Sequence, residues 1–182
     1  MVDWMSAHGG ALLKEIGRYV DMFWVGDDWG AQQCPFYSPD MFRRVFKPRV
    51  KKLISSLKKH TKARCAYHCC GSVRWAIPDL LDAGVDILNP VQVSAANMDS
   101  AELKREFGKD LSFWGGGVDT QRTLPFGSPA EVSAQVRERI RILAPGGRFV
   151  FNPIHNIQQG TPPENIVAAY DTARTAGVYP VR

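Results

Sequence analysis

Short apolar segments that alternate with helical ones are the feature that most restricts how this chain can fold. Five runs are typical of buried strands, at residues 21–25, 64–68, 85–88, 111–114 and 149–151. Helix signals precede the first run and separate the others. Among them, Gly84 is expected to end a helix and Ser128-Pro129-Ala130-Glu131 has the form of a capping box, and a last helix opens at Thr161-Pro162-Pro163-Glu164. Apolar strands that alternate with helices predict an α/β fold with a parallel sheet.

Length limits how much of such a fold the chain can build. A closed (β/α)8 barrel needs about 200 residues or more, and this chain has 182. Five βα units therefore predict either an open sheet or part of a TIM barrel. We expect a single domain over residues 1–182, with two unpaired sheet edges and a tendency to self-associate through them.

Positive charge is concentrated in one segment. Residues 41–64 hold ten Lys or Arg and no acid, in a chain of net charge +5. Apolar residues recur there at spacings of three or four, which predicts a helix with a solvated basic face. Ser38 is the expected N-cap, and Pro48 should kink or divide the helix. Without a nucleic-acid motif, we expect weak, salt-sensitive binding there and no specific nucleic-acid partner.

The composition, 45% hydrophobic and 23% charged, is that of an ordinary globular protein. No apolar run approaches the ~18 residues of a membrane span, and the N-terminus lacks a signal-peptide layout. We therefore expect a cytoplasmic protein without a membrane partner. In that reducing compartment Cys34, Cys65, Cys69 and Cys70 should be free thiols or metal ligands.

Polar residues follow each predicted strand, at the rim where α/β folds carry their sites. In strand order they are Asp27 and Asp28; His68, Cys69 and Cys70; Asn89 and Gln92; Gly115, Gly116, Gly117 and Asp119; and Asn152 and His155. We expect these residues to converge on one site. Asp27 and Asp28 fit a general base, a cation ligand or a polar loop. The glycine run fits either close approach of a ligand or a tight turn.

His68-x-Cys70 is the sharpest local feature. Two ligands two residues apart at a strand end can face one point, and an imidazole with a thiolate suits zinc. Catalytic zinc keeps three protein ligands and an open position, and His155 is the candidate third ligand. The competing interpretation makes His68 an ordinary hydrogen-bonding residue, with Cys69 and Cys70 as small core residues.

Several motifs occur in a fixed order along the chain. They are Gly26-Asp27-Asp28-Trp29-Gly30, Ser38-Pro39-x-x-Phe42 with Pro48, His68-x-Cys70-Gly71, Gly117-Val118-Asp119, and Asn152-x-x-His155 followed by Gly160-Thr161-Pro162-Pro163-Glu164-Asn165-Ile166. In this order the chain resembles the uroporphyrinogen decarboxylase superfamily, which includes the decarboxylase of haem biosynthesis and cobalamin-dependent methyltransferases. The resemblance covers nearly all of the chain but only strands four to eight of the family barrel. It implies a partial (β/α)8 barrel, truncated on its N-terminal side.

The two branches of this superfamily imply different chemistry. Its corrinoid methyltransferases bind zinc through a His-x-Cys pair, matching His68 and Cys70, and a later cysteine that aligns with His155. In the decarboxylase, a histidine aligned with His155 contacts the porphyrinogen, and a substrate-contacting serine aligns with Asp28. The resemblance implies His155, Asp28 and Asp27 as catalytic residues. The expected substrate-binding residues are Asn89, Gln92, Gly116, Gly117, Asp119 and Asn152.

Three functions follow as alternatives. The first is a zinc-dependent methyltransferase that acts with a corrinoid protein on a small molecule. The second is a uroporphyrinogen decarboxylase, which needs no metal. The third is an inactive fragment or subunit that requires a partner, either an N-terminal barrel half or a second copy. His68 and Cys70 favour the first, and the missing strands leave open whether the chain alone is an enzyme.

Overall fold

The strands of this protein follow one another in space as they do in sequence. A computed structural model describes residues 1–181, in which the sheet order is β1-β2-β3-β4-β5. The prediction of an α/β fold with five successive parallel strands is confirmed. The chain divides into two compact units, Met1–Leu88 (unit 1) and Asn89–Arg182 (unit 2). The expectation of a single domain stays a prediction.

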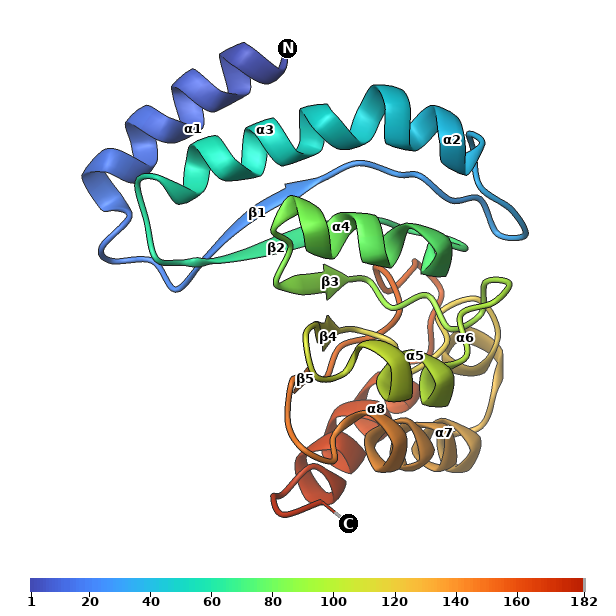
Figure 1. Cartoon of the computed structure of the whole chain (residues 1–182). Coiled ribbons are helices and arrows are strands. Elements are labelled where there is room, and N and C mark those ends of the chain that lie inside the picture. Colours follow the sequence, from blue (N-terminus) through green and yellow to red (C-terminus); the bar gives the residue numbers. More distant parts are fainter. Residues whose placement is uncertain (182) are drawn as a thin grey trace. The chain divides into compact units, whose positions relative to one another are not determined.

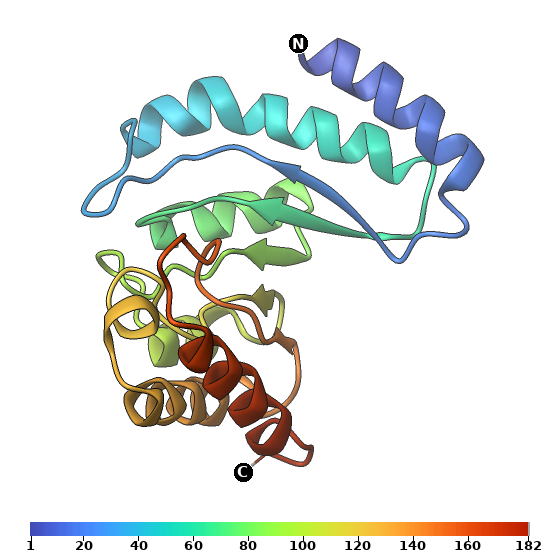
Figure 2. The same ribbon diagram turned by 180° about the vertical axis from the view of Figure 1, so that it is seen from behind.

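Unit 1 is built around two long parallel strands. In β1 (Met22–Gly26) and β2 (Arg64–His68), Met22 lies opposite Arg64 and Gly26 lies opposite His68. Helix α1 (Val2–Ile16) packs on α3 (Lys47–Lys58), and α3 packs on α4 (Ile77–Ala83). Both views show α1 and α3 on the same side of β1 (Figure 1 and Figure 2). A 3-10 turn (Arg74–Ala76) leads into α4.

The helix predicted after Ser38 runs without a break to Lys58, but its hydrogen-bond pattern changes just before Pro48. The Ser38 hydroxyl accepts a hydrogen bond from the Met41 N–H (3.2 Å) at the start of α2 (Pro39–Met41). A π-helical segment (Phe42–Phe46) follows and leads directly into α3. Pro48 is the physical reason, because it has no N–H for the carbonyl four residues earlier and the α-helical ladder is interrupted there.

An aromatic cluster forms the core beneath this helical run. The Phe42 side chain is 1% exposed and meets Trp75 edge-on, with ring centroids 5.2 Å apart. On its other side lies Trp29, at 5.1 Å. The Trp29 indole N–H donates to the Tyr67 hydroxyl on β2 (2.9 Å). Trp29, although part of the Asp-Asp-Trp-Gly motif, is therefore a packing residue.

The basic segment was predicted to have a solvated face, but most of its cations pair with acids. Its apolar face is turned inward as expected, with Phe42, Leu53, Ile54 and Leu57 buried. Six of its ten cations, however, form ion pairs. These pairs are Arg43–Asp79, Lys47–Asp79, Lys47–Asp82, Lys51–Asp82, Lys52–Asp3, Lys58–Asp86 and Arg64–Asp86. Many of these acids lie on α4 or just before β3, distant in sequence, so no local pattern revealed the pairing.

Asp86 is a partly buried acid of this set, its side chain 23% exposed, and it gives a stability prediction. Its carboxylate accepts the Cys65 N–H (2.8 Å) and pairs with Lys58 at 2.7 Å. Burial acts to raise the pKa of Asp86, but Lys58, the Cys65 N–H and Arg64 together lower it below its usual value. A carboxyl with a depressed folded-state pKa stabilises the fold above its unfolded pKa, and this contribution is lost as pH falls through the folded value.

We therefore expect Asp86→Asn to lower the free energy of unfolding by about 1–3 kcal/mol at pH 7. The difference from the parent protein should shrink as pH falls below about 4, where both proteins carry a neutral side chain. Urea unfolding at pH 7 and pH 3 measures both effects. Asp82→Asn, which removes exposed pairs, is the matched control and should change stability little. Equal effects from the two variants would contradict the role given to Asp86.

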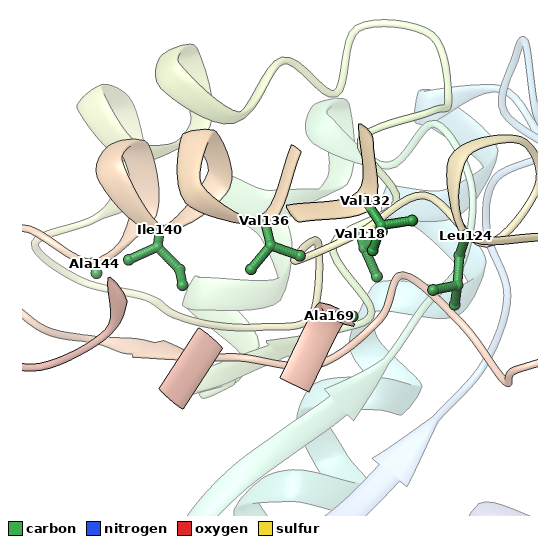
Figure 3. Packing of buried hydrophobic residues seen from close by; sticks show 7 residues of the cluster. All are labelled: Val118, Leu124, Val132, Val136, Ile140, Ala144 and Ala169. Carbon is green, nitrogen blue, oxygen red and sulfur yellow. The ribbon is translucent and has the colours of Figure 1, made fainter. Parts of the chain in front are cut away.

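Unit 2 joins two short strands to a pair of packed helices. In β4 (Ser112–Trp114) and β5 (Phe149–Val150), Phe113 lies opposite Phe149. Helices α7 (Pro129–Leu143) and α8 (Pro163–Ala176) pack together, and α5 (Ser100–Phe107) and α6 (Thr123–Phe126) each contact α7. Figure 3 shows the apolar cluster between them, which consists of Val118, Leu124, Val132, Val136, Ile140, Ala144 and Ala169.

Local signals placed most helix ends in unit 2. The predicted capping box is present, since the Ser128 N–H donates to the Glu131 carboxylate (2.7 Å) and the Glu131 N–H to the Ser128 hydroxyl (3.3 Å). The Asp99 carboxylate caps α5 by accepting the Glu102 N–H (2.9 Å). Helix α6 was not predicted, because four residues are too few to show a helical period.

The third strand begins two residues later, and ends one residue later, than predicted. The expected strand was 85–88, whereas β3 covers Ile87–Asn89. Val85 still belongs to the turn that ends α4, because its N–H donates to the Leu80 carbonyl (3.1 Å) after Gly84, whose φ is +99°. No helix among residues 1–181 is long and apolar enough to cross a membrane.

Candidate metal and substrate site

His68 and Cys70 lie side by side at the end of β2. The chain turns at Gly71, where φ is +83°, and the Cys70 Sγ lies 3.2 Å from the His68 Nε2. Tetrahedral zinc bound to one sulfur and one imidazole nitrogen holds those two atoms about 3.6 Å apart. The pair therefore has the donor atoms, and nearly the spacing, that one zinc ion requires.

The adjacent cysteines occupy different environments. Cys69 is fully buried, and burial raises the pKa of its thiol far above the usual range. Cys70 is half-buried, and burial together with the Asp28 carboxylate raises the pKa of its thiol to about 12. The free Cys70 side chain is thus a neutral thiol near pH 7. A bound dication reverses this preference, because it stabilises the thiolate.

Asp27 and Asp28 connect the end of β1 to this pair. Asp28 Oδ1 accepts the Cys70 N–H (2.9 Å), and the Asp27 N–H donates to the His68 carbonyl (3.0 Å). These bonds fix the two strand ends relative to each other. Burial raises the pKa of the Asp27 carboxyl, which moves it toward the range in which carboxyl groups exchange protons near neutral pH.

Gly26 leaves the space that the His68 side chain occupies. A Cβ atom at position 26 would lie 2.7 Å from the His68 Cβ and 2.7 Å from its carbonyl oxygen. Real Cβ atoms essentially never approach so closely, and these atoms belong to a paired strand that cannot readily shift. Gly26 is therefore required by the close approach of the two strand ends that carry the candidate metal pair.

A cavity of about 480 Å³ opens beside His68 within unit 1. Its lining residues are Met5, Trp24, Val25, Gly26, Asp27, Asp28 and His68. The Trp24 ring lies 6.1 Å from the His68 ring, measured between centroids. A cavity of this size, with an aromatic wall beside the polar groups of Asp27, Asp28 and His68, suits a small-molecule substrate. The sequence did not single out Trp24 or Met5, although alternation along β1 places Trp24 on the face opposite the buried Phe23 and Val25.

His155 belongs to unit 2 and follows an extended hydrogen-bond ladder. Beyond β4 and β5, the Gly117 N–H donates to the Asn152 carbonyl (2.9 Å) and the Ile154 N–H to the Val118 carbonyl (3.0 Å). His155 comes directly after this ladder, with an exposed side chain. The ladder therefore fixes the backbone that carries the imidazole, while His155's role as a ligand stays a prediction.

The other predicted residues of unit 2 have structural contacts. The Asn89 amide donates to the Trp114 carbonyl (3.1 Å), and Asp119 Oδ1 accepts the Gln121 N–H (2.7 Å). Gly116 has a φ of +77°, and a side chain at Gly117 would collide with the Phe151 ring. Gln92 is partly buried in the loop after β3. Substrate binding by these residues and by Asn152 stays a prediction.

Comparison with known proteins assigns the family. The family model for uroporphyrinogen decarboxylase (URO-D) matches residues 12–176. The chain belongs to the URO-D family. A uroporphyrinogen decarboxylase of Synechocystis sp. is 24% identical over 148 residues, which cover 81% of this chain and 39% of that protein. A methyltransferase from Methanosarcina mazei has the same fold, with a TM-score of 0.70 at 22% identity.

The matches cover most of this chain but only part of each relative. The methyltransferase structure covers 96% of this chain, while the chain covers 47% of that structure. The chain thus spans about half or less of the length of the relatives it matches. This agrees with the expected partial barrel, because the five strands described here match only part of the longer relatives.

Proposed function

We propose that this URO-D family protein is a zinc-dependent methyltransferase-type member, with the metal held by His68, Cys70 and His155. The observation that carries the proposal is the 3.2 Å approach of the Cys70 Sγ to the His68 Nε2 at a strand end. A burial difference supports it, since Cys69 is packed in the core while Cys70 is half-buried. His155 is proposed because it aligns with the third zinc ligand of the methyltransferase branch.

Three residues near the metal pair would each have a separate role in this function. Asp28 orients Cys70 through its backbone N–H (2.9 Å). Asp27, whose pKa is raised by burial, holds or accepts a proton at the mouth of the cavity. Trp24 supplies an apolar wall for the substrate. Zinc, when bound, supplies a Lewis acid that activates a methyl acceptor.

The proposed partners follow from this chemistry. The methyl group would come from, or pass to, a corrinoid carried on a separate protein, and the cavity beside His68 would hold the small-molecule acceptor or donor. The fold shared with a methyltransferase from Methanosarcina mazei supports this choice. The roles proposed for Asn89, Gln92, Gly116, Gly117, Asp119 and Asn152 are contacts with the same small molecule.

A second candidate function is uroporphyrinogen decarboxylation. It is favoured by the relative from Synechocystis sp. that carries that name. In this case His155 would contact the porphyrinogen, Asp28 would replace a substrate-contacting serine, and no metal would be needed. Because the chain spans less than half of that relative, we also propose that either activity needs the remaining strands, supplied by an N-terminal barrel half or a second copy.

Metal analysis separates the two functions. We expect the purified chain to hold about one zinc ion per molecule after dialysis, and cobalt(II) in its place should give a thiolate-to-metal absorption band. A chain that binds no zinc and decarboxylates uroporphyrinogen in the presence of a chelator would overturn the methyltransferase proposal.

A further inference from the structure

A second cavity lies in unit 1, at the end of the strands opposite to His68. It has a volume of about 930 Å³ and is open to solvent. Two segments line it, Gly17, Arg18, Val20 and Asp21 between α1 and β1, and residues 58–64 from the end of α3 to the start of β2. Since β1 begins at Met22 and β2 at Arg64, this cavity is at the amino ends of the strands. Nothing in the proposed methyl-transfer chemistry uses it.

Hydrogen bonds hold the two lining segments together. The Thr61 hydroxyl donates to the Gly17 carbonyl (2.6 Å), and the Arg64 N–H donates to the Asp21 carbonyl (2.9 Å). A Cβ at Gly17 would lie 2.9 Å from the Thr61 Cβ, which shows how closely the segments approach. The backbone of the cavity wall is therefore fixed before any ligand arrives, which lowers the entropic cost of binding.

Positive charge dominates this wall. Five cationic side chains line the cavity against the single acid Asp21; they are Arg18, Lys58, Lys59, Lys62 and Arg64. Asp86 pairs with both Lys58 and Arg64 and offsets one further charge, so an excess of three positive charges remains. His60 also lines the cavity.

Within the described part of the chain, two of these cations have no ion-pair partner, unlike most cations of the basic segment. Along α3, acids of α1, α4 and the turn before β3 pair with Lys47, Lys51, Lys52 and Lys58. Among residues 1–181, Lys59 and Lys62 take part in no ion pair, and both are exposed. Arg18 reaches the same cavity from a different segment, its guanidinium 4.5 Å from the Tyr19 ring. A solvated face of one helix would explain cations on that helix alone. It does not explain why Arg18, from a different segment, lines the same cavity as Lys59 and Lys62.

We infer that this cavity binds a small molecule with clustered phosphate groups, an oligophosphate or nucleoside triphosphate. Lysine ammonium groups and arginine guanidinium groups are the usual ligands of phosphate oxygens. The volume is that of a small-ligand cavity rather than of an extended groove. The lining holds no Trp, Phe or Tyr on which successive bases could stack, which argues against a nucleic-acid strand.

Calorimetric titration of the full chain tests this inference, with tripolyphosphate as the probe at about 50 mM salt, where charge screening is weak. We expect saturable binding with one site, weakened by added salt. The variant Lys59→Gln/Lys62→Gln should bind at least about tenfold more weakly, because it removes two of the three excess charges. Arg44→Gln/Lys109→Gln removes two exposed cations elsewhere and should change the affinity less than about twofold.

The same titration, repeated with ATP, distinguishes a nucleotide from a simple phosphate chain. ATP that binds more tightly than tripolyphosphate indicates a nucleotide, and equal affinity indicates that the phosphate chain alone is recognised. Absence of saturable binding would overturn the inference, as would equal weakening in both double variants. Binding of a single-stranded oligonucleotide that tripolyphosphate does not displace would also overturn it. Circular dichroism of each variant checks that the fold is retained. None of these results depends on zinc.

Discussion

Cys70→Ala is expected to reduce bound zinc from about one ion per chain to nearly none. The thiolate is the strongest ligand proposed for the site, and its removal leaves two imidazoles and water. Metal analysis after dialysis measures the loss directly. His155→Ala should weaken zinc binding strongly without abolishing it at high zinc, because His68 and Cys70 are positioned by their own strand end.

Cys69→Ala is the matched control for this prediction. It removes the same thiol from the neighbouring residue, which is fully buried and packed away from the pair. We expect zinc content to be unchanged and stability to fall by about 1 kcal/mol through loss of packing. Zinc loss in Cys69→Ala with retention in Cys70→Ala would show that Cys69, and not Cys70, is the zinc ligand. Retention of zinc in both variants would remove the basis of the methyltransferase proposal.

Phe42→Ala is expected to have the largest effect on stability. The side chain is 1% exposed and fills the space between Trp29 and Trp75, with edge-on contacts to both rings. Truncating a buried phenylalanine costs about 3–5 kcal/mol through lost burial and the cavity left behind. Urea unfolding followed by tryptophan fluorescence measures this loss and reports on the two neighbouring indoles.

Phe126→Ala is the matched control, because it removes the same side chain from an exposed position. Phe126 is 84% exposed on α6, so Phe126→Ala should leave the free energy of unfolding within about 0.5 kcal/mol of the parent value. A loss in Phe42→Ala no larger than in Phe126→Ala would show that the aromatic cluster is not part of the stable core.

Local chemistry made much of the fold predictable. Strand β2 was placed correctly to the residue, and the capping box at Ser128 and the left-handed Gly84 ended or began helices where expected. These signals act within a few residues. The ion pairs of Asp79 and Asp86 were not predictable, because their partners lie more than twenty residues away and only the fold brings them together.

The motifs that indicated the family combine two kinds of residue. His68 and Cys70 lie beside a cavity, as a functional interpretation requires. Trp29 and Asn165 belong to equally distinctive motifs but are structural. Asn165 is 1% exposed, and its amide donates to the Leu124 and Gly127 carbonyls (2.9 and 2.7 Å), which fixes α8 to α6. A sequence pattern alone does not distinguish these roles, because packing and ligand binding both favour specific residue types at fixed spacing.

The contact between Gly26 and His68 limits how the metal pair can be transferred to another protein. The two residues lie 42 positions apart, yet any side chain at position 26 would meet the backbone and Cβ of His68. Because these atoms are common to nearly all residues, the need for glycine comes from the close approach of the two strand ends and not from the imidazole. Grafting the His-x-Cys pair onto another barrel would accordingly require transfer of both strand ends, not of the three-residue motif alone.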